Sequence, residues 1–270
     1  MRLAKVLLLS VLILSGCDHL DNFFDKTSQQ APVEEADEKV EQGRKDYPKD
    51  PEEEREELSE EEMMIQELPT EANVADWNLI LVNPWQALPE NYEVEFVEVD
   101  NTQQIDARIE EAWNTWRDAA LEAGHDLFFA SGYRTVNRQR NNFNNSVSEY
   151  LNEGYSEKEA IEKTKEYLTE PGHSEHHTGL ALDIVDHAWI NAGRRLEPEY
   201  DTQESQQWLV KTMADYGFIL RYPAGKEEIT GIQYESWHFR YVGVEHAQFM
   251  KQYDLVLEEY VDLIKMRDDI

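Results

Sequence analysis

The apolar periodicity that a folded core requires is confined to residues 71–270 of this 270-residue chain. Residues 18–70 hold 19 Asp and Glu against 6 Lys and Arg, and prolines interrupt acidic runs such as Glu52–Glu54 and Glu60–Glu62. A high like charge with low hydrophobicity predicts a segment that repels itself and stays disordered. We therefore expect one folded domain over residues 71–270, preceded by an acidic tether.

Charge and cysteine content exclude two classes of protein. The formal net charge is −32, of which residues 18–70 contribute −13 and residues 71–270 contribute −21. Phosphate binding needs a basic surface, so we expect no nucleic-acid partner. Cys17 is the only cysteine, which excludes a disulfide scaffold. The sequence indicates no particular oligomeric partner.

Residues 1–16 have the pattern of a signal peptide. Arg2 and Lys5 precede the apolar run Val6–Leu14, which is too short for a membrane span of about 20 residues but typical of a signal-peptide core. The adjoining Leu14-Ser15-Gly16-Cys17 resembles the bacterial lipobox, in which the cysteine is diacylated and becomes the mature N-terminus. The alternative is an ordinary signal peptide that leaves Cys17 as a free thiol. We expect a lipoprotein signal over residues 1–16, and a lipidated Cys17 with its tether over 17–70. The protein would then be extracytoplasmic and anchored to the bacterial cell membrane.

The remaining 200 residues mix short strands with helices. Strand patterns cover Asn78–Val82, Tyr92–Val99, Leu127–Ala130, Leu180–Val185, Phe218–Tyr222 and Trp237–Val242. Helical patterns cover Ile105–Ala123, Thr135–Asn152, Ser156–Leu168, Ser205–Tyr216 and Val244–Met266. Ser156 with Glu159 predicts a capping box at the start of the third of these. Because βαβ regularity is missing, the order predicts an α+β fold with a small, mostly antiparallel sheet flanked by helices.

Three stretches concentrate the residue types that bind metals or anions: Ser131–Thr135, Pro171–Asp183 and Glu235–Tyr241. A catalytic zinc needs three protein ligands, an open position for water, and a carboxylate that takes the proton of that water. His176, Asp183 and His238 with Glu235 form a chemically complete set. The alternative is that the three histidines between residues 173 and 177 only form a polar loop, and spacing alone leaves this open.

A longer pattern joins these stretches: Ser174-x-His176-x-x-Gly179-x-Ala181-x-Asp183, then Glu235-x-Trp237-His238-x-Arg240-Tyr241. It closely resembles the zinc D,D-carboxypeptidases of the VanY type, D-alanyl-D-alanine carboxypeptidases, and their L,D-carboxypeptidase relatives LdcB and DacB. Two further segments match in the family's order: Ser131-Gly132-Tyr133-Arg134 and Arg221-Tyr222-Pro223-x-Gly225-Lys226. The resemblance implies a single D,D-peptidase or hedgehog-like zinc domain with one Zn²⁺ per chain.

The resemblance also implies roles for the matched residues. His176, Asp183 and His238 would bind the zinc, and Glu235 would be the catalytic general base. Arg134 would pair with the terminal carboxylate of the substrate, which a guanidinium binds bidentately; a structural ion pair is the alternative.

Four further residues would contact the substrate. Gln139 and Ser174 match positions that line the substrate pocket in these relatives. Tyr222 and Trp237 would wall the cleft, although both could equally be core aromatics. Among the nearby acids, Asp186 could compete with Asp183 as a ligand, but the family pattern favours Asp183.

The implied activity is that of a hydrolase of the cell wall: a zinc metalloprotease acting as a carboxypeptidase on peptidoglycan stem peptides. It would remove the C-terminal D-alanine, with D,D-cleavage of a pentapeptide favoured over L,D-cleavage of a tetrapeptide. An endopeptidase that cuts cross-links is disfavoured by the arginine. A non-catalytic cell-wall binding module is disfavoured by the complete ligand set.

Overall fold

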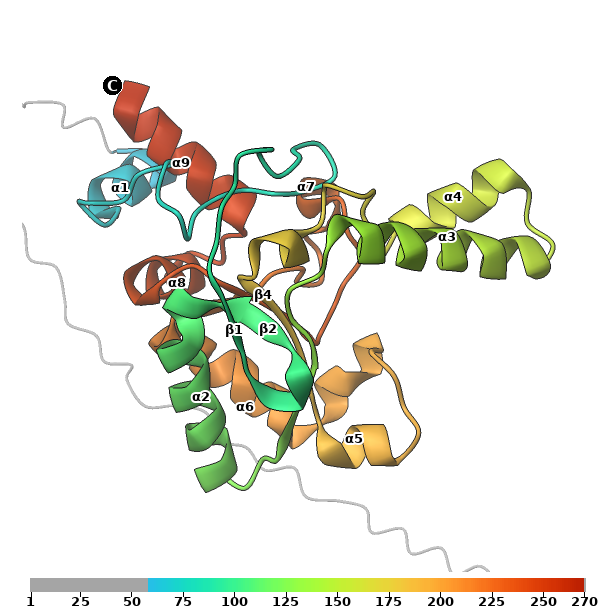
Figure 1. Ribbon diagram of the computed structural model, residues 1–270. Helices are drawn as coiled ribbons and strands as arrows, with labels where there is room; N and C mark the ends of the chain where they lie inside the picture. The colour runs from blue at the N-terminus through green and yellow to red at the C-terminus, as the bar shows by residue number, and fades with distance from the viewer. Residues whose placement is uncertain (1–57, 270) are drawn as a thin grey trace, which may run out of the picture. The chain divides into compact units, whose positions relative to one another are not determined.

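The computed structural model describes residues 58–269. The α-helices in this part of the chain are α1 (Glu60–Glu67), α2 (Glu110–Glu122), α3 (Val136–Asn152), α4 (Glu157–Lys165), α5 (His187–Asn191), α6 (Glu204–Thr212), α7 (Glu227–Thr230), α8 (Val244–Gln252) and α9 (Leu257–Asp269). The strands are β1 (Phe96–Glu98), β2 (Gln104–Asp106), β3 (Leu127–Ser131), β4 (Ala181–Asp186), β5 (Phe218–Leu220) and β6 (His238–Tyr241). The expected α+β class with a small antiparallel sheet is confirmed (Figure 1).

The larger sheet has four antiparallel strands in the order β3–β4–β6–β5. In the register of β4 with β6, Asp183 lies directly opposite His238. Directly opposed residues of an antiparallel pair project from the same face of the sheet. Strand pairing therefore brings together two side chains that are 55 positions apart in the sequence.

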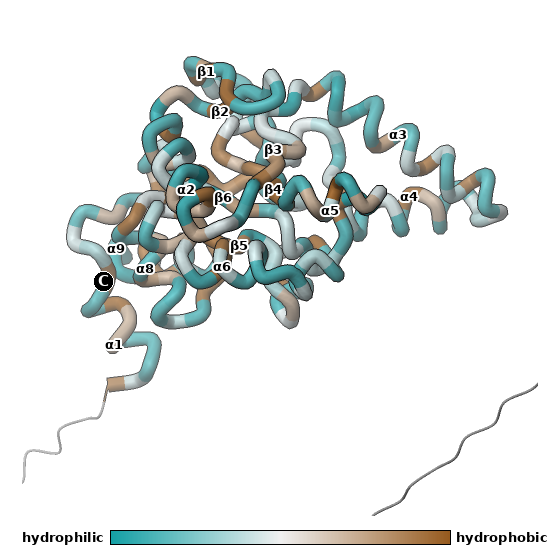
Figure 2. The backbone as a smooth tube through the Cα atoms, turned by 90° about the horizontal axis from the view of Figure 1, so that it is seen from below, coloured by the Kyte–Doolittle hydropathy of each residue, from teal (hydrophilic) through white to brown (hydrophobic). Residues whose placement is uncertain are grey.

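The other face of this sheet carries the main hydrophobic core. Leu182 and Ile184 flank Asp183 in β4, so the alternation of a strand turns them away from the site and into the core. Helices α2 and α6 cover that face; Trp113 and Trp116 of α2 are fully buried there. Figure 2 shows the apolar residues gathered along β3, β4 and β6, while α3 is largely hydrophilic.

The folded part begins earlier than the acidic composition predicts. Helix α1 lies within the predicted tether, and Ser59 and Glu62 close a capping box at its start. Met64 and Ile65 pack with Leu68 against a second core formed by α8 and α9, and α1 lies beside α9 (Figure 1). Part of the predicted tether therefore packs on the domain, because a short apolar stripe among glutamates is enough to dock this helix. The predicted signal peptide, Cys17 and the tether up to residue 57 lie outside the described residues.

Three further predicted elements differ in the structure. The predicted strand over 78–82 forms no β-strand in the described chain. The predicted helix over 105–123 starts only at Glu110, because Gln104–Asp106 pair with β1 instead. The predicted closing helix is two helices, and Asp254 between them has a φ of 51°, which an α-helix cannot contain.

Helices α3 and α4 pack against each other as a hairpin that projects from the rest of the domain (Figure 1). The capping box of Ser156 and Glu159 at the start of α4 is confirmed. Gln139 is the buried residue of α3. Its amide donates to the carbonyl of Thr169 at 2.7 Å, which ties the base of the hairpin to the segment after α4.

In the described part of the chain, none of the helices combines the length and the apolar content that crossing a membrane requires.

Candidate active site

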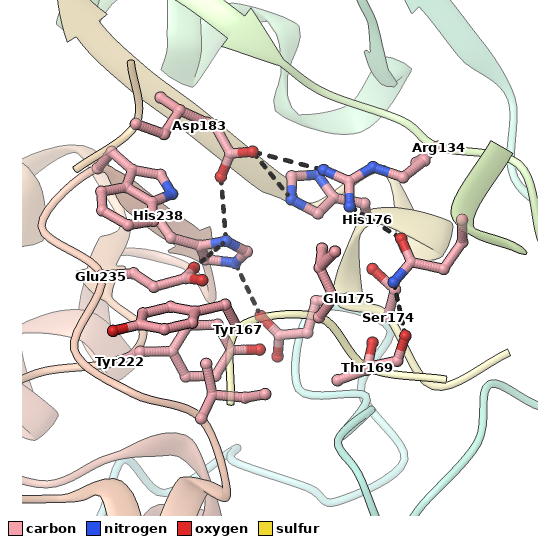
Figure 3. Close-up of a pocket in the computed structure, with 15 residues that line it drawn as sticks. Arg134, Tyr167, Thr169, Ser174, Glu175, His176, Asp183, Tyr222, Glu235 and His238 are labelled. Carbon is pink, nitrogen blue, oxygen red and sulfur yellow. Dashed lines mark hydrogen bonds and ion pairs between the residues drawn. The ribbon is translucent and has the colours of Figure 1, made fainter. Parts of the chain in front are cut away.

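Three buried side chains converge above β4 and β6. His176 comes from a 3₁₀ turn, η3 (Glu175–Thr178), Asp183 from β4 and His238 from β6. Their donor atoms all lie within 4.8 Å of one another. Figure 3 shows Asp183 between the two imidazoles: Oδ2 lies 3.2 Å from Nε2 of His176, and Oδ1 lies 3.1 Å from Nδ1 of His238.

A glycine and a carbonyl set the position of His176. The turn η3 ends at Gly179, whose φ is 75°; a Cβ there would lie 2.8 Å from the backbone nitrogen of Asp106. Nδ1 of His176 is 2.8 Å from the carbonyl oxygen of Gly132. A carbonyl only accepts hydrogen bonds, so Nδ1 carries the proton and Nε2 presents its lone pair toward Asp183.

Glu235 completes the cluster from the loop before β6. Its Oε2 lies 3.3 Å from Nδ1 of His238, and the side chain is buried. The Nδ1 edge of His238 therefore faces two carboxylates, those of Asp183 and Glu235.

The donor set fits a zinc ion. Oδ1 of Asp183 is buried and makes no hydrogen bond within the described residues, although Nδ1 of His238 is close to it. An unsatisfied buried carboxylate oxygen is costly, and a dication shared by Asp183 and the two imidazoles would satisfy it. Two imidazole nitrogens with one carboxylate also match the ligand types of catalytic zinc sites.

The pKa values of Glu235 and Asp183 are shifted in opposite directions. Burial raises the pKa of Glu235, although contact with His238 partly opposes this effect. Burial would also raise the pKa of Asp183, but His176 and His238 outweigh it and hold that pKa below its usual range. Burial, together with Arg134, lowers the pKa of His176 to about 4. Asp183 therefore remains ionised, while Glu235 is the better proton acceptor.

Arg134 extends the site beyond the cluster. Its backbone N–H donates to the carbonyl of His176 at 3.0 Å. In the guanidinium, Nη1 donates to Oε1 of Gln139 at 2.8 Å, and Nη2 donates to Oγ of Ser131 at 3.2 Å and lies 3.5 Å from Oδ2 of Asp183. Nε is buried and has no hydrogen-bond partner among the described residues. A buried cation with a donor to spare can bind an anionic group.

These residues line one cavity of about 210 Å³. Its wall is formed by Arg134, Gln139, Tyr167, Leu168, Thr169, Ser174, Glu175, His176, Asp183, Leu196, Tyr222, Ile232, Glu235, Trp237 and His238. All nine predicted site residues of the folded domain are among them. Tyr222 and Trp237, for which cavity wall and core are the alternatives, are buried and also border the cavity. The competing acid, Asp186, instead accepts a hydrogen bond from the backbone N–H of Trp189.

Sequence reasoning missed Glu175, which stands at an unspecified position (x) of the quoted pattern. Its side chain is fully buried and pairs with Arg221 and Arg240. Both arginines belong to the matched segments and lie within predicted strands, and an arginine buried in a strand requires an acid as partner. That requirement was the signal that could have identified Glu175. The segment Tyr167–Thr169 carried no comparable signal.

The VanY family model, described as D-alanyl-D-alanine carboxypeptidase, matches residues 102–244. A D-alanyl-D-alanine carboxypeptidase of Enterococcus faecalis is 38% identical over 190 residues, which cover 70% of this chain and 68% of that protein.

Solved structures are similar to about 70% of the chain. A mutant of the vancomycin resistance D,D-pentapeptidase VanY in complex with Zn(II) has a TM-score of 0.62 at 38% identity, covering 69% of this chain and 99% of that one. VanYB in complex with D-alanine-D-alanine has a TM-score of 0.62 at 37% identity, with 69% and 98% covered. The LdcB LD-carboxypeptidase has a TM-score of 0.58 at 38% identity, with 70% and 87% covered. The chain belongs to the VanY family of D-alanyl-D-alanine carboxypeptidases.

Proposed function

We propose that this protein is a zinc-dependent carboxypeptidase that removes the C-terminal D-alanine from peptidoglycan stem peptides. One observation carries the proposal: a buried His₂Asp donor set and a carboxylate of raised pKa share a cavity with a buried arginine. Family membership and the similarity to VanYB in complex with D-alanine-D-alanine support the substrate class.

Each residue of the set has a distinct task. Nε2 of His176, a carboxylate oxygen of Asp183 and Nδ1 of His238 would hold the zinc. When bound, zinc supplies a Lewis acid and lowers the pKa of a coordinated water. Glu235 takes a proton from the water that attacks the scissile carbonyl, and passes it to the amine of the departing D-alanine.

Arg134 selects the bond that is cut. A carboxypeptidase must recognise a free C-terminal carboxylate, and the guanidinium at the cavity wall can bind it. Gln139 and Ser131 hold two nitrogens of Arg134 in place. An anchored carboxylate fixes which peptide carbonyl lies next to Glu235. Ser174, Tyr222 and Trp237 form further walls around the bound end.

L,D-cleavage of tetrapeptide stems is the second candidate, and the similarity to LdcB favours it. The same ligands, base and arginine would serve both reactions. Mass spectrometry of synthetic tetrapeptide and pentapeptide stems incubated with the purified protein distinguishes them. We expect the pentapeptide to lose one alanine. Cleavage of the tetrapeptide alone would replace D,D with L,D specificity, and cleavage of neither peptide would refute the proposal.

The lipobox-like Leu14–Cys17 supports a further proposal, that Cys17 is diacylated and anchors the enzyme outside the cytoplasmic membrane. The acidic segment that follows would let the domain reach the wall. In cells, Cys17→Ala should abolish incorporation of labelled fatty acid and release the protein from the membrane fraction. Equal labelling of wild type and variant would contradict this assignment.

A further inference from the structure

The two carboxylate oxygens of Glu175 have different surroundings. Oε1 is 2.7 Å from Nε of Arg221 and 2.6 Å from Nη1 of Arg240, and both arginines donate to it. Oε2 is buried and has no hydrogen-bond partner in the described part of the chain. One oxygen is therefore saturated, while the other remains available.

The available oxygen faces a ligand of the proposed zinc site. Oε2 of Glu175 lies 3.6 Å from Nε2 of His238, slightly beyond hydrogen-bond distance (Figure 3). Nε2 of His238 is likewise buried and without a hydrogen-bond partner among the described residues. Two complementary orphaned atoms thus face each other, and an approach of a few tenths of an ångström would satisfy both.

A hydrogen bond from Nε2 of His238 to Glu175 would affect the other ring nitrogen, Nδ1. Nδ1 faces Asp183 and Glu235, so it is the nitrogen on the metal side. A neutral imidazole carries a single N–H, and a proton held on Nε2 leaves the lone pair on Nδ1.

We propose that Glu175 is a positioning residue: its Oε2 accepts the Nε2–H of His238 and thereby presents Nδ1 to the zinc. The inference rests on the zinc site of the proposed function. It assigns to Glu175 the part that an outer carboxylate plays behind a metal-bound histidine, fixing both the tautomer and the ring orientation.

The surroundings hold Glu175 rigidly in this position. Arg221 is bound on its far side by Glu258 of α9, at 2.6 and 2.8 Å. Arg240 also donates to the carbonyls of Asn78 and Ile80. The two arginines balance the charges of the two glutamates, and none of these four charges can move without breaking an ion pair. Glu258 lies outside the segment that matches the family.

The test compares Glu175→Gln and Glu175→Ala with Glu258→Gln in the mature full-length protein. Glu258→Gln removes a carboxylate from the same arginine cluster but leaves the Glu175–His238 pair intact, so it is the matched control. Zinc affinity is measured by competition with a chromogenic chelator, and circular dichroism identifies the folded fraction. We expect the zinc Kd of both Glu175 variants to rise about 10- to 100-fold, and that of Glu258→Gln to stay at the wild-type value.

Two results would overturn the inference: wild-type zinc affinity in the Glu175 variants, or an equal loss of affinity in Glu258→Gln. A second measurement requires no variant. Histidine ¹⁵N NMR of the zinc-loaded wild type should show His238 protonated at Nε2, and a proton on Nδ1 would refute the role of Glu175. If the wild type neither binds zinc nor cleaves stem peptides, the proposed function fails. If it does both and the Glu175 variants match it, only this inference fails.

Discussion

Two clusters of buried charge lie side by side in this domain, and they differ in how closely permanent cations pair with their carboxylates. In the arginine cluster, formed by Glu175, Arg221, Arg240 and Glu258, every charged side chain has an opposite partner within 2.8 Å. In the metal cluster, formed by His176, Asp183, Glu235 and His238, Asp183 keeps an unsatisfied oxygen. The permanent cation that contacts Asp183 is Arg134, whose Nη2 lies 3.5 Å from Oδ2 of Asp183.

This difference indicates a structural role for the arginine cluster and a cation-binding role for the metal cluster. Close ion pairs between permanent charges contribute rigidity, whereas a carboxylate without a close permanent cation favours the binding of a cation. The two clusters meet at one point, where Glu175 of the first faces His238 of the second. Perturbing each cluster separately tests this division.

Removing zinc should have the largest effect on activity. Dialysis against a chelator is expected to abolish hydrolysis of the stem peptide, and added Zn²⁺ should restore it. The fold should survive because the arginine cluster and the hydrophobic cores do not involve the metal. Zinc at a hundred times its Kd should add about 2.7 kcal/mol to the free energy of unfolding. Full activity in protein shown by elemental analysis to lack metal would remove the metal cluster from the mechanism.

Glu235→Gln should reduce kcat about 10²- to 10⁴-fold, the usual contribution of a general base, with zinc still bound. The amide keeps the shape of the side chain but cannot accept the proton. Glu228→Gln, at an exposed glutamate of α7, is the control and should retain wild-type kcat. If Glu235→Gln instead loses its zinc, Glu235 acts as a ligand rather than as a base.

Arg134→Ala should lower kcat/KM for a free stem peptide about tenfold to a hundredfold, as expected for lost hydrogen bonds to a charged group. Arg134→Lys should recover part of the loss, since a lysine lacks the planar fork. Arg138→Ala changes an exposed arginine of α3 and serves as control. A substrate whose C-terminus is amidated should be nearly insensitive to Arg134→Ala; an equal loss on both substrates would indicate a structural role.

Arg240→Met should act on stability more than on chemistry. It leaves Glu175 with one of its two arginines and frees the carbonyls of Asn78 and Ile80. Breaking a buried ion pair in this way costs about 3–5 kcal/mol of unfolding free energy. Urea unfolding of metal-free protein measures this loss. A variant as stable as the wild type would show that the arginine cluster is dispensable for folding.

Local sequence was sufficient for much of the fold. The predicted strand over 127–130 and the helix over 135–152 correspond to β3 and α3, and the Ser156 capping box closes as expected. These elements depend on periodicity and on contacts between near neighbours, which a single sequence displays. The nine predicted site residues of the folded domain, from Arg134 to His238, also surround one cavity.

Other features depended on partners distant in the chain. Gln104–Asp106 continues the pattern of the following helix, but pairing with β1 makes it a strand. The stripe of Met64, Ile65 and Leu68 appears negligible among glutamates until α9 covers it. Glu175 looks like a solvated acid in a polar loop, and only Arg221 and Arg240, 46 and 65 positions later, bury it.

The sequence was thus sufficient to predict the residue types that this chemistry uses, their order, and the elements that carry them. Which atoms face one another was decided by the tertiary structure, because the register of β4 with β6 opposes Asp183 to His238. The folded interior also sets the pKa values, because burial raises that of Glu235 while His176 and His238 lower that of Asp183.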